Sequence, residues 1–347
     1  MLFRQDPFSL SSVCPDDKNW SEVRVDCIYR YCIKSSELLA FSRTISIRLN
    51  LNIDVGAHEY PVDDTLTVLK KSVSLRCNNI PDVSDKRIGI LFSGGVDCSV
   101  LASLAHLTLP NDFQIDLFNV AFENNRILAS SSYEVPDRIS GRISYQELCE
   151  LYPKRKFNFY PIDIPNSRYY AARSRVVSLM NPNNSVMDLS IAIALWFASS
   201  VENECRIVLV GSGADEQLGG YSRHRNAWDV GGREQLIKEL QLDIDRIPCR
   251  NLGRDDRCIS DQGKEARFPF LDEDVVSYLS ELPIESKMDM TLPRGQGEKR
   301  LLRLVARKLG FSDQVAFLPK RAIQFGARTA KLEVDGPNHG NEKISHI

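Results

Sequence analysis

Residues 87–101 read Arg87-Ile-Gly-Ile-Leu-Phe-Ser93-Gly-Gly-Val-Asp97-Cys-Ser99-Val-Leu101. This stretch joins a short apolar run, a Ser-Gly-Gly turn and an apolar helix face. The run predicts a strand over 88–92, and apolar residues at 100, 101, 104 and 107 predict a helix. Gly94 and Gly95 allow a sharp turn close to a ligand, and the new helix directs unpaired N–H groups into the same space. The stretch therefore predicts an anion site, with a phosphate as the natural occupant.

The residues after the turn distinguish this loop from a Walker A phosphate loop. No Gly-Lys-Ser/Thr follows the glycines, so the loop itself supplies no lysine to a β- or γ-phosphate. Asp97 and Ser99 follow instead. A carboxylate beside a phosphate site is best explained by a divalent cation between the two. We therefore expect Mg²⁺, with Asp97 as its protein ligand.

A second glycine-rich loop follows another apolar run. Residues 206–210 lead into Gly211-Ser-Gly-Ala-Asp-Glu-Gln-Leu-Gly-Gly-Tyr221, and residues 115–122 predict a strand parallel to 88–92, with a crossover helix at 99–107. Ligands of doubly wound sheets lie beyond the carboxyl ends of the strands, so Val120 and Phe122 are expected beside the first loop. Two such loops can line one crevice and share one nucleotide.

The rest of the pattern is mainly helical. It predicts a polar loop over 124–146, an edge strand over 160–165, and helices from about 61 and over 187–200, 233–247, 272–282 and 298–309. Charged residues between 251 and 272 indicate either a solvated surface or a binding wall, and the sequence leaves both open. The predicted fold class is α/β, a parallel sheet with helices on both faces, a helical carboxyl-terminal portion and a small N-terminal appendage.

Composition restricts the classes of partner. The 347 residues include 44 basic and 46 acidic side chains, and the net charge of -2 gives no general attraction to nucleic acid or to anionic membranes. No apolar run reaches membrane-spanning length and no signal peptide is recognised, so we expect a cytoplasmic protein. Nine scattered cysteines without a Cys-x-x-Cys pair predict free thiols rather than disulfides or zinc.

The first loop resembles the Ser-Gly-Gly-x-Asp-Ser-Ser loop of ATP pyrophosphatases that form adenylated intermediates, with Cys98 at the first serine of the closing pair. The order of four segments along the chain is similar to that in the synthetase domain of asparagine synthetases. These segments are the two glycine loops, then Glu265-Ala-Arg-Phe-Pro-Phe-Leu-Asp272, then Gln324-Phe325. The sequence of residues 213–225 is most similar to that of the asparagine synthetase domain-containing proteins. The resemblance covers about 61–331, which leaves a β-rich appendage at 1–60, with strands near 24–29 and 44–51, and a polar tail at 332–347.

The resemblance implies an adenine nucleotide alpha hydrolase-like fold that uses ATP and Mg²⁺. In that family the side-chain carboxylate of aspartate is adenylated, pyrophosphate leaves, and ammonia then displaces AMP. The implied pyrophosphate and metal contacts are Ser93, Gly94, Gly95, Asp97 and Ser99. The implied adenosine contacts are Leu91, Val120 and Gly211, with Ser212 and Asp215 in the second loop near the ribose or the substrate amine.

Three positions depart from the family's pattern. Leu2 stands where the glutaminase nucleophile is a cysteine, so residues 1–60 are at most a remnant of that domain, and free ammonia or a partner chain is the expected amide donor. Ser212 stands where a glutamate handles the proton of ammonia. Ala322 stands where some members have a pyrophosphate-binding lysine, so Lys320 and Arg321 are the expected catalytic cations.

The leading hypothesis is an ATP-dependent ligase that adenylates aspartate, a small-molecule substrate, and takes part in asparagine biosynthesis. One alternative is a pseudoenzyme that keeps the ATP site as a sensor or scaffold, which Ser212 favours because serine is no base at neutral pH without an activator. The other alternative is an adenylating enzyme of the same loop class that acts on a nucleotide or a tRNA base. The near-zero net charge argues against that one.

Overall fold

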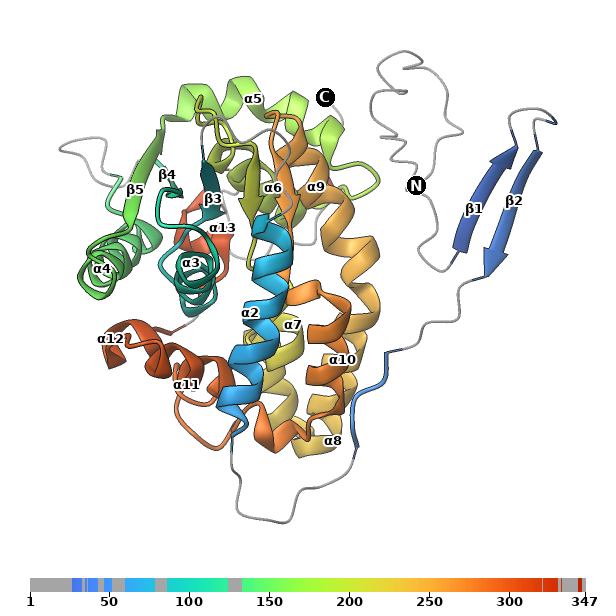
Figure 1. Ribbon diagram of the computed structural model, residues 1–347. Coiled ribbons are helices and arrows are strands. Elements are labelled where there is room, and N and C mark those ends of the chain that lie inside the picture. The colour runs from blue at the N-terminus through green and yellow to red at the C-terminus, as the bar shows by residue number, and fades with distance from the viewer. Residues whose placement is uncertain are drawn as a thin grey trace.

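A five-stranded parallel sheet organises the chain (Figure 1). The computed structural model describes residues 27–32, 35, 37–42, 47–51, 60–78, 86–123, 133–319, 321–329, 332 and 343–344. The strand order is β5-β4-β3-β6-β7, and every neighbouring pair is parallel. The strands are β3 (Arg87–Leu91), β4 (Gln114–Phe122), β5 (Lys156–Ile164), β6 (Ile207–Leu209) and β7 (Glu265–Arg267).

Helices cover both faces of this sheet, as the sequence predicts. One face packs against α2, α3 and α11, and the other against α5, α6 and α9 (Figure 1). The helices are α2 (Val62–Asn78), α3 (Val96–Thr108), α4 (Pro136–Leu151), α5 (Asn166–Leu179), α6 (Val186–Ala198), α7 (Ala214–Leu218), α8 (Ser222–Ile247), α9 (Gly253–Ser260), α10 (Glu273–Glu281), α11 (Arg300–Lys308), α12 (Asp313–Ala316) and α13 (Ile323–Gly326). Short η helices lie at η1 (Pro248–Leu252), η2 (Pro269–Leu271) and η3 (Ile284–Ser286).

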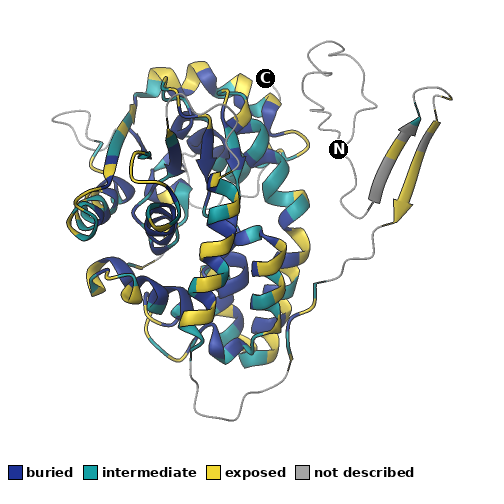
Figure 2. Cartoon of the chain, viewed as in Figure 1, coloured by how far each residue is buried: buried dark blue, intermediate teal, exposed yellow. Residues whose placement is uncertain are grey.

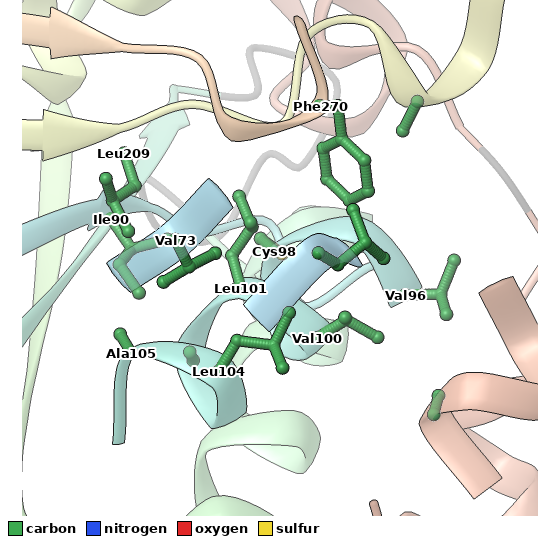
Figure 3. Close-up of a cluster of buried hydrophobic side chains, with 14 of the residues drawn as sticks. Val73, Ile90, Val96, Cys98, Val100, Leu101, Leu104, Ala105, Leu209 and Phe270 are labelled. Atoms are coloured by element: carbon green, nitrogen blue, oxygen red, sulfur yellow. The ribbon is translucent and has the colours of Figure 1, made fainter. Parts of the chain in front are cut away.

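Side-chain alternation along β4 fixes which residues face each layer. Leu117 belongs to the cluster that contains α2 and α3, whereas Val120 and Phe122 belong to the cluster that contains α6. Figure 3 shows the first cluster, in which Ile90 of β3 and Leu209 of β6 lie beside Val73 of α2 and side chains of α3. Burial on both faces explains why the central strands are almost continuously apolar (Figure 2).

The polar loop expected over 124–146 is wrong for residues 136–146, because α4 begins at Pro136. The buried face of α4 is itself polar and includes Asp137 and Arg138. Arg138 is buried because its Nε donates to Asn119 Oδ1 at 2.7 Å and its Nη1 pairs with Asp163 at 2.7 Å. An apolar periodicity search misses a helix whose buried side chains are charged and paired. Residues 124–132 lie outside the described part of the chain.

The N-terminal region contains one antiparallel hairpin, β1 (Cys27–Cys32) with β2 (Glu37–Ser42). The strand expected over 44–51 is wrong for its described residues 47–51, which form no strand. They lie along α8 and the end of α10 instead. Leu49 N–H donates to Gln241 Oε1 at 3.1 Å, and Asn50 N–H donates to the Ser280 carbonyl at 2.8 Å. These bonds to a helix side chain and a helix end replace the ladder of a strand.

At the other end of the chain, Ile344 is buried and its N–H donates to the Asn184 carbonyl at 2.8 Å. A described part of the polar tail is therefore packed against the start of α6. The cysteines at 32, 77, 98, 149, 205, 249 and 258 are free thiols. None of the described helices combines the length and the apolar character that a bilayer crossing requires.

Lys287, which follows η3, gives the fold a testable pH dependence. Its side chain is fully buried, its Nζ donates to the Leu279 carbonyl at 2.8 Å, and burial lowers its pKa to about 7. The unfolded chain, with an ordinary lysine pKa, binds one more proton above pH 7, so the free energy of unfolding should rise with pH by up to ~1.4 kcal/mol per unit. Urea unfolding between pH 7 and 8.5 should show this rise in the wild type, and Lys287→Met should lack it. Equal slopes in the two proteins would contradict the assignment.

Candidate functional site

Two adjoining cavities open at the carboxyl ends of the central strands. The first, which we call the sheet cavity, measures about 370 Å³ and is lined by Leu91, Val120 and Gly211 among others. The second, the loop cavity, measures about 390 Å³ and is lined by Gly95 and Lys299 among others. The residues that line both are Ser93, Asp97, Asp137 and Arg321. A ligand that extends from one cavity to the other therefore passes the Ser-Gly-Gly loop.

The Ser-Gly-Gly loop is fixed by hydroxyl groups of α4. Ser140 Oγ donates to the Ser93 carbonyl and Ser144 Oγ to the Gly94 carbonyl, each at 2.7 Å. Gly94 has φ +80°, and a Cβ there would lie 2.3 Å from the Ser140 backbone, so only glycine fits. No side chain caps the start of α3 at Gly95. The uncapped helix end, open to the loop cavity, is suited to an anion.

Lys299, which the sequence analysis missed, ties the two glycine loops together. Its Nζ donates to both carboxylate oxygens of Asp97 at 2.8 and 2.6 Å and lies 2.6 Å from Asp215 Oδ1. Its side chain is only 1% exposed. Asp97 belongs to the first loop's helix and Asp215 to the second loop's helix, so one buried ammonium bridges a carboxylate from each. A lysine about 80 residues beyond the second loop gave no local signal of this pairing.

The second loop is held by Glu216, whose carboxylate is fully occupied by neighbours. Its Oε2 accepts from the Gly213 N–H at 3.0 Å, and its Oε1 accepts from Tyr221 Oη at 2.7 Å and Asn251 Nδ2 at 2.8 Å. Burial, followed by the nearby carboxylates of Glu216 and Asp215, raises the pKa of Tyr221 well above its ordinary value. Glu216 thus fixes the loop, and Asp215 is the loop's acidic side chain that meets Lys299.

Of the two alternatives for the charged stretch 251–272, a solvated surface is wrong for Arg254 and Asp255. Both are buried and line the sheet cavity. Arg254 pairs with Asp188 at 2.7 Å and with Asp255 at 2.8 Å. Burial raises the pKa of Asp255, while the Arg254 guanidinium and a hydrogen bond from Ser212 act in the opposite direction. A carboxylate therefore contacts Ser212 from α9, far along the chain.

The structure brings most of the predicted site residues together. Those that line the sheet cavity are Leu91, Ser93, Asp97, Val120, Gly211, Ser212, Asp215 and Arg321. Phe122 lies in the core instead, and Lys320 is outside the described residues. Ser99 is fully buried and lines neither cavity, and its Oγ has no hydrogen-bond partner in the described part of the chain.

Cys98 occupies the position of the missing serine. It lines the sheet cavity, and its Sγ donates to the Gly95 carbonyl at 3.1 Å. Burial and the neighbouring Asp97 carboxylate raise the pKa of this thiol to about 11. Cys98 therefore remains a neutral thiol at physiological pH, and its hydrogen bond to Gly95 stabilises the turn.

Comparison with known proteins places this site in a family. The asparagine synthase family model matches residues 66–234 and 228–337, which include both glycine loops, Lys299 and the α9 wall. The chain belongs to the asparagine synthase family. Asparagine synthetase domain-containing protein 1 of Gallus gallus is 44% identical over 307 residues, covering 75% of this chain and 47% of that protein. The same protein of Homo sapiens is 42% identical over 315 residues, covering 76% and 49%.

A more distant family member is the glutamine-hydrolyzing asparagine synthetase of Homo sapiens. It is 25% identical over 311 residues, which cover 86% of this chain and 50% of that enzyme. The chain spans about half the length of the curated relatives it matches. The family uses ATP and small-molecule substrates, and this agrees with cavities built around an anion loop.

Lys299→Met tests whether the ammonium holds the two loops of this family member together. The variant leaves Asp97 and Asp215 facing each other without a cation, and loss of one partner from a largely buried ion group costs about 3 kcal/mol. Urea unfolding should show that loss. Adding Asp97→Asn and Asp215→Asn to Lys299→Met should recover part of it, because the two charges are gone. A single variant as stable as the wild type would contradict the bridging role.

Proposed function

We propose that this chain binds Mg-ATP across the two cavities and adenylates the side-chain carboxylate of aspartate. A carboxylate oxygen attacks the α-phosphorus, the bond between the α-phosphorus and its bridging oxygen breaks, and pyrophosphate leaves with the electron pair. Ammonia nitrogen then attacks the acyl carbon, the bond to AMP breaks, and the amine loses one proton to give asparagine. Little covalent help from the protein is needed, because alignment and charge compensation supply most of the rate enhancement in such transfers.

The observation that carries this proposal is the Lys299 bridge between the two glycine loops. It ties the uncapped start of α3 to the second loop through Asp97 and Asp215. The apolar residues of the sheet cavity, which include Leu91, Val120 and Val210, suit an adenosine. Polyphosphate then extends past Ser93 toward Lys299 and Arg321 in the loop cavity. Membership in a family that uses ATP supports the same placement.

The donor set is compatible with Mg²⁺ only if phosphate oxygens complete the coordination. Among the described residues no three His, Cys, Asp or Glu side chains are grouped closely enough to hold a metal alone. Asp97 and Asp215 do flank one cation, the Lys299 ammonium, which shows that this position already stabilises positive charge. Mg²⁺ commonly uses one or two carboxylates plus substrate phosphates. When bound, the ion would neutralise phosphate charge, with Asp97 as the expected protein ligand.

Asp255 supplies what Ser212 lacks for the amide-forming step. Its carboxylate lies within hydrogen-bonding reach of Ser212, lines the same cavity, and has a pKa raised by burial. A raised carboxylate pKa makes the group a better proton acceptor near neutral pH. We assign to Asp255 the proton that ammonia loses. The contact between Asp255 and Ser212 argues against the pseudoenzyme alternative, because it offers a proton acceptor at the position where Ser212 replaces the family's glutamate.

Asp97→Ala should abolish stabilisation by Mg-ATP. In the wild type, nucleotide at a hundredfold excess over its Kd should add about 2.7 kcal/mol to the free energy of unfolding. Differential scanning fluorimetry compares each protein with and without Mg-ATP, so a lower basal stability does not interfere. Asp112→Ala is the matched control, because Asp112 is exposed and pairs with Lys86. A shift retained in Asp97→Ala would exclude its role.

Asp255→Asn separates the two chemical steps. Adenylation should persist, since Asp255 does not line the loop cavity, whereas ammonia-dependent asparagine formation should fall by at least ~10²-fold. Exchange of labelled pyrophosphate into ATP in the presence of aspartate measures the first step, and amide formation measures the second. Equal loss of both activities would show that Asp255 supports the site generally and accepts no proton.

The experiment that tests the function as a whole is pyrophosphate release by the wild type with aspartate and ammonia. Release that requires aspartate supports the proposal. Stabilisation by Mg-ATP without such release supports the ATP-binding pseudoenzyme, and release with a nucleotide or tRNA acceptor supports the other adenylating class. No effect of ATP at all would refute every enzymatic interpretation.

A further inference from the structure

Arg328 combines two unusual features in the loop cavity. Its φ is +72°, in the left-handed region that residues other than glycine rarely adopt. In the described part of the chain the other non-glycine residues with positive φ are Lys86 and Lys299. Lys299 and Arg328 both line the loop cavity, whereas Lys86 lies at the start of β3. Backbone strain of this kind gathers at functional sites.

The neighbours of Arg328 impose this conformation on it. On one side, the Ala327 carbonyl accepts from the Phe122 N–H, at the end of β4, at 3.2 Å. On the other side, Thr329 is buried and its Oγ1 donates to the Ser190 carbonyl of α6 at 2.8 Å. Gly326 packs so tightly that a Cβ there would lie 2.0 Å from Asp137 Oδ1. The segment is therefore fixed on both sides of Arg328, and its side chain is presented to the loop cavity.

The cations of the loop cavity differ in how their charge is used. Lys299 is paired with two carboxylates, and Arg303 is held by the carbonyls of Glu298, Ala316 and Leu318. Arg328 has neither an ion pair nor a hydrogen bond to another described residue, and it is only partly buried. The acidic Glu134, which also lines this cavity, pairs with Arg142 at 2.6 Å. The Arg328 guanidinium is thus available to a ligand.

We propose that Arg328 binds the β- and γ-phosphates of the nucleotide and the pyrophosphate that leaves. This inference rests on the proposed function and adds a residue to it. When the bond to the α-phosphorus breaks, the departing pyrophosphate gains negative charge, and a planar guanidinium can donate two parallel hydrogen bonds to its oxygens. The backbone around Arg328 is already fixed on both sides, so binding orders the side chain alone and no loop.

Arg328→Gly gives a signature that a merely structural residue would not. Glycine relieves the left-handed strain, so the melting temperature without ligand should rise, while the Kd for magnesium pyrophosphate should increase at least tenfold. Isothermal titration calorimetry measures pyrophosphate binding, and AMP is the second probe, whose affinity should stay within twofold of the wild type. Arg328→Lys should retain an intermediate pyrophosphate affinity, because it keeps the charge without the planar pair of donors.

Lys86→Gly is the matched control, since it also removes a basic residue with a left-handed backbone, but at a position outside both cavities. It should bind pyrophosphate as the wild type does. Unchanged pyrophosphate affinity in Arg328→Gly, or equal loss of AMP and pyrophosphate affinity, would overturn the assignment while the proposed function stands. A wild type that binds neither Mg-ATP nor pyrophosphate would overturn both.

Discussion

One buried ammonium holds the two glycine loops of this protein in register. Lys299 meets Asp97 and Asp215, which come from helices that begin after β3 and β6. Those strands are hydrogen-bonded neighbours, so the sheet brings the loops close, but two carboxylates alone would repel each other. A cation between them is therefore a requirement of the architecture. It lies beside an uncapped helix start, an arrangement suited to an anion.

The other buried charged side chains of the site are each compensated by neighbouring groups. Glu216 is tied by three neighbours, and Arg254 is neutralised by Asp188 and Asp255. The proposed reaction uses the Asp255 carboxylate, whose pKa burial raises, and the guanidinium of Arg328 in the loop cavity, which Arg321 also lines. Asp255 lines the sheet cavity and Arg328 the loop cavity, so the roles proposed for them separate the amide-forming step from the departure of pyrophosphate.

Sequence patterns recovered the elements whose physics is local. The apolar runs at β3, β4 and β6, the glycine turns and the helix expected over 298–309 are all confirmed, because each depends on near neighbours in the chain. Sequence patterns failed where a buried charged side chain is compensated by partners far away in the sequence. The start of α4 was taken for a loop because its inward face is charged, and Asn119 and Asp163, on other strands, satisfy Arg138.

The site shows the same division between local and distant causes. Ser93, Gly94, Gly95 and Asp97 could be recognised from the loop itself, whereas Lys299 and Asp255 could not. Lys299 is about 200 residues from Asp97, and nothing in its helix marks it as the partner of two carboxylates. Asp255 meets Ser212 only in the folded chain, because α9 follows α8 and η1 and lies beside the second loop. Such residues become visible when tertiary structure sets them beside the loops.

The central claim is that the two loops form a single ATP site, with its polyphosphate on the Ser-Gly-Gly turn. A crystal structure with Mg²⁺ and an ATP analogue that cannot be cleaved between its α- and β-phosphates tests it most directly. The account predicts the base among Leu91, Val120 and Val210, and the β- and γ-phosphates between the start of α3 and Lys299. Phosphates bound elsewhere, with Gly94 and Gly95 uncontacted, would contradict it.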